Sequence, residues 1–150
     1  MSRLSLGQLA LAMSEMLRSG REVSFCPEGE SMLPLLPPGQ CKVVLTRMDG
    51  LPRKYDILFY CRENGVFLLH RVVSVQEETC TMCGDNQYLL ETGLKPQNVI
   101  GRMKGFYRNG VYNDLQSPGY RIYCRTLWLR RLWLKCRGYI SARRRRPDQN

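Results

Sequence analysis

Two Asn-Gly dipeptides, at residues 64–65 and 109–110, constrain the fold of this chain more than any other feature. The first joins two runs of β-branched, aliphatic and aromatic residues, over 56–62 and 66–75, and the second follows such a run over 99–107. Asn-Gly favours the tight turns with positive φ angles that connect antiparallel strands. The sequence therefore predicts two β-hairpins in the middle of the chain.

Further short strands and two terminal helices complete the expected fold. The same kind of pattern predicts strands over residues 22–25, 41–46 and 79–83. Apolar residues recur with helical spacing over residues 5–18, where residues 5–8 have the spacing of a capping box and Gly20 is the predicted C-cap. We therefore expect a mainly β domain over residues 1–117, followed by a basic amphipathic helix and tail over residues 118–150.

Positive charge is concentrated at the C-terminal end of the chain. Residues 1–101 contain 10 Lys or Arg and 11 Asp or Glu, whereas residues 102–150 contain 13 and 2. The second segment alone therefore carries a net charge of +11, and an acidic partner is expected to bind there.

Cysteine content and hydropathy indicate a cytosolic protein. The number of cysteines is odd, and residues 1–17 are too short and too polar for a secretory signal peptide, which predicts reduced thiols. No segment approaches the roughly 20 apolar residues that span a bilayer.

Cys80 and Cys83 form a CxxC pair, but without a second pair and with a single histidine they lack the ligand set of a zinc site. We therefore expect no metal or cofactor.

Three polar residues stand out as candidates for chemistry. Ser31 lies in a glycine- and proline-rich segment over residues 27–39, where a turn can expose a side chain. His70 is the only histidine of the chain and lies inside a strongly apolar run. Asp85 lies in a Gly-Asp-Asn turn. Each feature alone is common in proteins without catalytic activity, so their order and spacing must carry the inference.

In that order and spacing, four short segments resemble the type I signal peptidase superfamily, which includes self-cleaving repressors. The segments are GESMLP (29–34), KYDIL (54–58), HRV (70–72) and GDN (84–86). Tyr55 departs from the family pattern, which usually has glycine at this position. The resemblance covers about residues 22–107. It implies a mainly β fold with a coiled, multi-stranded catalytic sheet and flanking helices.

The resemblance also implies roles for individual residues. Ser31 would be the nucleophile and His70 the general base, since a histidine in the third segment is typical of the endoplasmic-reticulum, archaeal and spore-former branch. A neutral imidazole can take the serine proton and return it to the leaving amine. An acid on the other ring nitrogen would fix the tautomer, with Asp85 the first candidate and Glu91 the second. The Ser31 N–H is the expected oxyanion donor, whereas Gly29 stands where many members have a hydroxyl.

The expected function is that of a serine endopeptidase acting on a peptide or precursor protein. Membrane signal peptidases carry an anchor before the nucleophile, and self-cleaving repressors carry a DNA-binding domain. This chain has neither, so we expect it to act in the cytosol or at the inner face of the membrane, where maturation of a ribosomally made precursor peptide is one hypothesis. One alternative is a catalytically inactive module of the same fold that binds peptides at a sheet edge. Another is a membrane- or polyanion-binding adaptor.

The C-terminal helix has two interpretations. One side of it carries an apolar arc: Trp128, Leu129, Leu132, Trp133, Cys136, Tyr139 and Ile140. Either this arc packs on the β domain, or it lies on an anionic membrane. We expect residues 118–130 to pack on the domain and the arginines at 143–146 to contact a membrane or polyanion. Nucleic acid is the less favoured partner, because no helix-turn-helix, zinc finger or aromatic–glycine motif is present.

Overall fold

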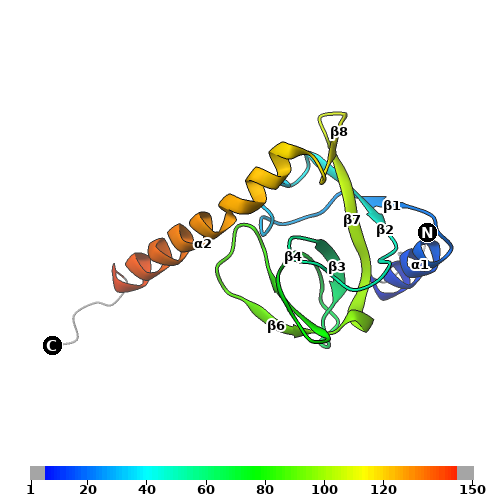
Figure 1. Cartoon of the computed structure of the whole chain (residues 1–150), viewed down its shortest axis with the longest axis horizontal. Coiled ribbons are helices and arrows are strands. Elements are labelled where there is room, and N and C mark those ends of the chain that lie inside the picture. The colour runs from blue at the N-terminus through cyan, green and yellow to red at the C-terminus, as the bar shows by residue number, and fades with distance from the viewer. Residues whose placement is uncertain (1–5, 145–150) are drawn as a thin grey trace.

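The computed structural model describes residues 6–144, in which an antiparallel sheet is flanked by one helix at each end (Figure 1). The elements are, in chain order, α1 (Leu6–Arg18), β1 (Val23–Phe25), β2 (Cys41–Thr46), β3 (Ile57–Cys61), β4 (Phe67–Gln76), β5 (Thr79–Cys83), β6 (Glu91–Leu94), a 3-10 turn (Pro96–Asn98), β7 (Val99–Arg108), β8 (Val111–Asp114) and α2 (Pro118–Arg144). The predicted mainly β architecture with two terminal helices is confirmed.

The strands form one eight-stranded sheet in the order β1-β2-β7-β3-β4-β5-β6, and β8 pairs with β7. Both Asn-Gly hairpins are confirmed, joining β3 to β4 and β7 to β8. In the second hairpin Arg108 pairs with Val111, and Asn109 and Gly110 have φ angles of 51° and 79°, as a two-residue loop of this kind requires. The sequence does not predict β6, which has four residues and contains Gly93 at a φ of 82°.

Helix α1 ends at the glycine that the sequence indicates. Gly20 has a φ of 80° and donates its N–H to the Leu17 carbonyl at 3.0 Å, while the Arg21 N–H reaches the Met16 carbonyl at 3.1 Å. This pair of bonds is the Schellman motif, which glycine favours because it has no Cβ. The predicted capping box at residues 5–8 includes Ser5, which lies outside the described residues.

Two clusters of buried apolar residues lie on opposite faces of the sheet. Ile57 and Leu69 belong to the first cluster, which α1 covers, whereas Leu58 belongs to the second. Successive residues of a strand point to opposite faces. Because Leu69 faces the first cluster, the side chain of His70 faces the second and that of Arg71 again the first. Neighbouring residues of β4 are therefore directed to separate sites.

Helix α2 packs on the β domain through a different side from the one expected. The side chains that turn towards the domain are buried or half-buried: Tyr120, Tyr123, Cys124, Leu127, Arg130, Arg131 and Leu134. By contrast, Trp128 and Trp133 remain 62% and 54% exposed, and the rest of the apolar arc is exposed with them. The expected packing of residues 118–130 on the domain is therefore confirmed, whereas packing of the apolar arc on the domain is contradicted. The reason is that the domain presents polar groups to α2, so Arg130 turns inward and donates to the Asp85 carbonyl at 3.2 Å and to Asn86 Oδ1 at 2.8 Å.

Figure 1 shows α2 starting near the β7–β8 hairpin and extending away from the sheet at its C-terminal end. The predicted tail at residues 143–146 lies outside the residues whose side chains the structure describes. Within residues 6–144, neither α2 nor α1 is long and apolar enough to cross a membrane.

Candidate functional site

The loop that carries Ser31 is fixed to the β domain from two directions. Met32 is buried in the first core cluster. On the other side of the loop, Arg108 at the end of β7 donates to the carbonyls of Pro34 and Leu35, at 2.8 and 2.6 Å. Ser31 itself is half-buried. The nucleophile candidate therefore lies on an ordered loop and is partly accessible.

The segment over residues 84–86 lies directly against Ser31. The Asn86 N–H donates to the Ser31 carbonyl at 2.8 Å. A Cβ on Gly84 would lie 2.5 Å from that same carbonyl oxygen and 2.9 Å from Gln87 Oε1, so a side chain at this position would displace the loop. The first and fourth segments of the resemblance are thus in contact, and the contact requires a glycine.

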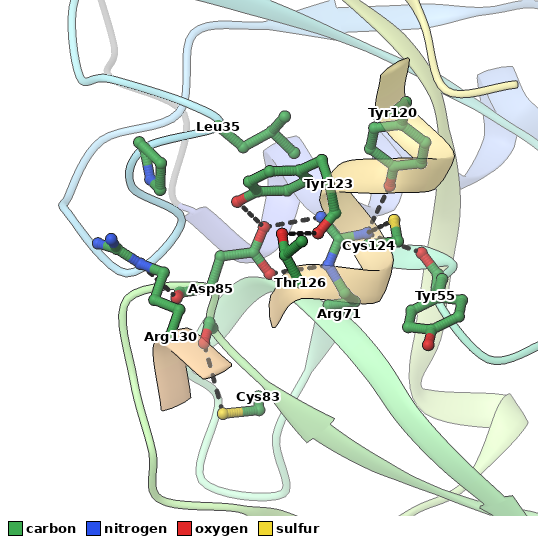
Figure 2. A network of polar contacts seen from close by, with 12 residues as sticks. Leu35, Tyr55, Arg71, Cys83, Asp85, Tyr120, Tyr123, Cys124, Thr126 and Arg130 are labelled. Atoms are coloured by element: carbon green, nitrogen blue, oxygen red, sulfur yellow. Dashed lines mark hydrogen bonds and ion pairs between the residues drawn. The ribbon is translucent and has the colours of Figure 1, made fainter. Parts of the chain in front are cut away.

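Asp85 forms an ion pair with Arg71 in the interior of the protein (Figure 2). Both side chains are fully buried, and the guanidinium meets the carboxylate with two bonds of 2.7 Å. The Tyr123 hydroxyl donates to the same carboxylate at 2.9 Å, while Arg71 also donates to the Tyr55 carbonyl at 3.0 Å and to the Tyr120 hydroxyl. Asp85, the first candidate for the catalytic acid, is therefore engaged with Arg71 and α2. Within the described residues it makes no hydrogen bond with His70.

Tyr55 occupies the position where the resemblance leads us to expect glycine. Its φ angle is 78°, in the left-handed region that glycine adopts freely and other residues rarely adopt. Its N–H donates to the Val72 carbonyl at 2.9 Å, and its own carbonyl accepts from Arg71. The backbone at this position thus has a conformation typical of glycine, although the residue is tyrosine.

His70 is the end of a chain of polar contacts that contains Glu91, the second candidate for the acid. The Tyr60 hydroxyl donates to Glu91 Oε2 at 2.8 Å and lies 3.3 Å from His70 Nδ1. Arg62 donates to both oxygens of Glu91 at 2.7 Å. A phenol has one proton, so Tyr60, which gives that proton to Glu91, can only accept from His70. Neutral His70 therefore has its proton on Nδ1 and an unprotonated Nε2.

The protonation of the site follows from burial and from these hydrogen bonds. Burial lowers the pKa of His70 below its ordinary value of 6.5, although the negative charge of Glu91 opposes this shift. Hydrogen bonds from Arg62 hold the pKa of Glu91 below its usual value. At neutral pH the site therefore holds a neutral imidazole and an ionised carboxylate, linked by one hydroxyl.

The free nitrogen of His70 is buried beside a cavity. His70 is 4% exposed, and its Nε2 has no hydrogen-bond partner among residues 6–144. His70 lines a cavity of about 330 Å³ together with Asn86, Glu91 and Leu134, and Leu134 belongs to α2. This cavity and the Ser31 loop therefore share Asn86 as a neighbour.

The structure does not bring the four predicted site residues together at one point. Ser31 contacts the segment that contains Asp85, and His70 is linked to Glu91, but within the described residues no hydrogen bond joins Ser31 to His70. Sequence reasoning does not identify Tyr60. The hairpin register points to it, because His70 pairs across the strands with Leu58, two residues away on the same face of β3.

The two cysteines of the CxxC pair lie in different surroundings. Cys80 is buried in the second core cluster, while the Cys83 Sγ lies 3.4 Å from each of the carbonyl oxygens of Gly84, Gln87 and Leu89 and can donate its one proton to any of them. Among the described residues no group of three or more His, Cys, Asp or Glu could hold a metal ion. All seven cysteines lie in this part of the chain and are free thiols.

In comparisons with known proteins, no protein-family model, no curated protein and no solved structure matches this chain. Its function must therefore be inferred from its own residues.

We expect Asp85→Asn to lower the free energy of unfolding by about 3–5 kcal/mol, because it leaves the charge of Arg71 buried and uncompensated. Asp49→Asn is the matched control. Asp49 and its ion-pair partner Arg47 are 80% and 60% exposed, so the change should stay within about 0.5 kcal/mol. Urea unfolding followed by circular dichroism measures both. Equal effects of the two substitutions would contradict a structural role for Asp85.

Proposed function

We propose that the protein is a serine endopeptidase in which Ser31 is the nucleophile and His70 the general base. The observation that carries the proposal is the Nε2 atom of His70, which is buried and without a partner among residues 6–144. Its unprotonated state is inferred from the hydrogen bond that Tyr60 donates to Glu91. A buried polar atom without a partner is costly, and such atoms are rare unless they have a function. His70 lines a cavity together with Asn86, whose N–H is bonded to the Ser31 carbonyl.

The reaction needs Ser31 and His70 to meet when the substrate binds. Catalytic hydrogen bonds are often long or misaligned before substrate binding and shorten in the complex. The Ser31 hydroxyl would then give its proton to Nε2 as its oxygen bonds to the scissile carbonyl carbon. The imidazolium would return that proton to the leaving amine nitrogen. In the second step water would give a proton to Nε2 as its oxygen attacks the ester carbonyl carbon. The ester bond to Ser31 would break, the proton would return to the Ser31 oxygen, and the new carboxyl end would be released.

We assign the role of the orienting acid to Glu91, acting through Tyr60. The Nδ1–H of His70 faces the Tyr60 oxygen, and the Tyr60 hydroxyl is bonded to Glu91. This arrangement holds the tautomer that leaves Nε2 free, and it places a negative charge near the imidazolium that forms during the reaction. Asp85 then has a structural role beside Arg71.

The resemblance to signal peptidases supports the same activity and a peptide or precursor protein as substrate. Two structural details agree with it. The first and fourth segments are in contact at Ser31 and Gly84, and Tyr55 has the backbone conformation of the glycine that it replaces.

Ser31→Ala and His70→Gln should each abolish cleavage of a proteome-derived peptide library, with losses of at least about a thousandfold. Ser24→Ala, which changes an exposed serine on β1, should cleave like the wild type. Mass spectrometry of the peptide ends measures all three. Cleavage that persists in Ser31→Ala would refute the proposal. A wild-type protein that cuts no peptide would favour the inactive peptide-binding module.

Tyr60→Phe should lower kcat by roughly tenfold or more with little change in KM, because the Nδ1–H of His70 loses its link to Glu91. Tyr123→Phe is the matched control, since it removes a hydroxyl bonded to Asp85 instead. It should leave kcat near the wild-type value. Thermal melts confirm that both variants fold. The opposite ranking of the two variants would make Asp85, not Glu91, the orienting acid.

The acid limb of the pH profile should report His70. Protonation of Nε2 removes the base, and burial lowers the pKa of His70, so kcat/KM should fall at a pH below 6.5. Glu91→Gln should move this limb to still lower pH, because the carboxylate charge raises the His70 pKa. Rates measured from about pH 4 to pH 8 test both expectations. A limb at or above pH 6.5 in the wild type would contradict them.

A further inference from the structure

The side of α2 that faces away from the β domain carries a row of exposed apolar residues, which we call the outer face. Its residues are Ile122, Trp128, Leu129, Leu132, Trp133, Tyr139 and Ile140, each at least half exposed. They recur at intervals of three, four and seven residues, which places them along one side of a helix. The opposite side is occupied, because Leu127 is 2% exposed and Leu134 lines the cavity beside His70. The helix therefore has apolar residues on both sides, and the β domain covers only one of them. The exposed side is a candidate surface for a partner.

Basic residues are interspersed with this outer face. The helix α2 carries eight Lys or Arg and no Asp or Glu. Among the basic residues, Arg121, Arg125, Lys135 and Arg137 are exposed. Arg121 and Arg125 also border a groove that Arg53 and Lys54 line from the β domain. The occupant of the outer face must therefore be apolar where it meets the tryptophans and anionic around them.

We propose that the outer face of α2 binds the surface of an anionic phospholipid bilayer. Aliphatic side chains and tryptophans enter the boundary between headgroups and acyl chains, where tryptophan and tyrosine are enriched. Lysine and arginine beside them reach the lipid phosphates. The cations recur along the whole length of α2, so the helix lies in the plane of the interface. Neither Ser31 nor His70 takes part in this binding, which is independent of the peptidase activity.

Two other occupants fit the outer face less well. A second copy of the chain would bring together two helices that each have at least four exposed cations and no acidic residue, and like charges repel. A nucleic acid would satisfy the cations, but its phosphate backbone offers nothing to a row of leucine and isoleucine side chains. An anionic bilayer satisfies both the cations and the apolar side chains.

The two tryptophans of the chain, Trp128 and Trp133, both lie on the outer face and make the test direct. Their emission should shift to shorter wavelength when the full-length protein meets vesicles of phosphatidylcholine containing about 30% phosphatidylglycerol. The protein should also sediment with these vesicles. Vesicles of phosphatidylcholine alone should cause little shift, and raising NaCl to about 0.5 M should weaken binding, because salt screens exposed charges.

Variants then locate the contact. Leu129→Ser with Leu132→Ser should abolish sedimentation, whereas Leu51→Ser with Val111→Ser, which changes exposed apolar residues of the β domain, should bind like the wild type. Lys135→Gln with Arg137→Gln should weaken binding to anionic vesicles by about 25-fold, since each basic residue at such a surface contributes about fivefold.

Four results would overturn the proposal, and they need only the wild-type protein. The first is no emission shift with anionic vesicles, and the second is an equal shift with neutral ones. The third is a shift that rises with protein concentration in the absence of lipid, which would identify a second copy as the occupant. The fourth is a shift caused by duplex DNA but not by vesicles.

Discussion

The buried ion pair between Arg71 and Asp85 is the interaction on which the rest of the structure depends. Removing two charges from water costs several kcal/mol for each, and only a fully satisfied network offsets that cost. Arg71 comes from β4 and Asp85 from the loop after β5, and both are bonded to tyrosines of α2. The carbonyl of Tyr55 completes the arrangement from the loop before β3. One pair of charges therefore sets the relative positions of two loops, one strand and the C-terminal helix.

The sheet also separates the contacts of the two residues in the dipeptide His70-Arg71. Because consecutive residues of β4 point to opposite faces, the arginine can hold Asp85 while the histidine faces Tyr60 and the cavity. An acid that is paired with an arginine is a poor partner for an imidazole. Glu91 is paired as well, with Arg62, but the Tyr60 hydroxyl still connects it to His70. Proximity along the sequence therefore does not decide which acid is linked to His70.

Much of the fold follows from local sequence patterns. The Asn-Gly turns, the period-two runs and Gly20 each act over a few residues, and the structure contains the strands and the helix end that they predict. Strand β6 is not predicted because a segment of four residues that contains a glycine shows no alternation of apolar and polar residues. It is a strand because it pairs with β5. The sequence does not predict which side of α2 faces the domain, for another reason. Periodicity separates the sides of a helix, but which side is covered depends on what the domain presents to it.

Sequence patterns predict the candidate site only in part, as they do the fold. Order and spacing single out Ser31, His70, Asp85 and Glu91, yet the partners of the two acids are visible only in three dimensions. Arg71 is 14 residues from Asp85, and Tyr60 is 31 residues from Glu91. No local pattern links such positions, because the sheet register brings them together.

Leu134 gives the cavity beside His70 a wall that belongs to α2. If the outer face of α2 rests on a bilayer, the helix separates the His70 site from the lipid. The height of that site above the bilayer is then the diameter of one helix, about 10 Å. The protein would then search for substrates in two dimensions, and it would reach only those chains whose scissile bond stands at that height. Selectivity would come from the distance between a cleavage site and the membrane, in addition to the side chains around the bond.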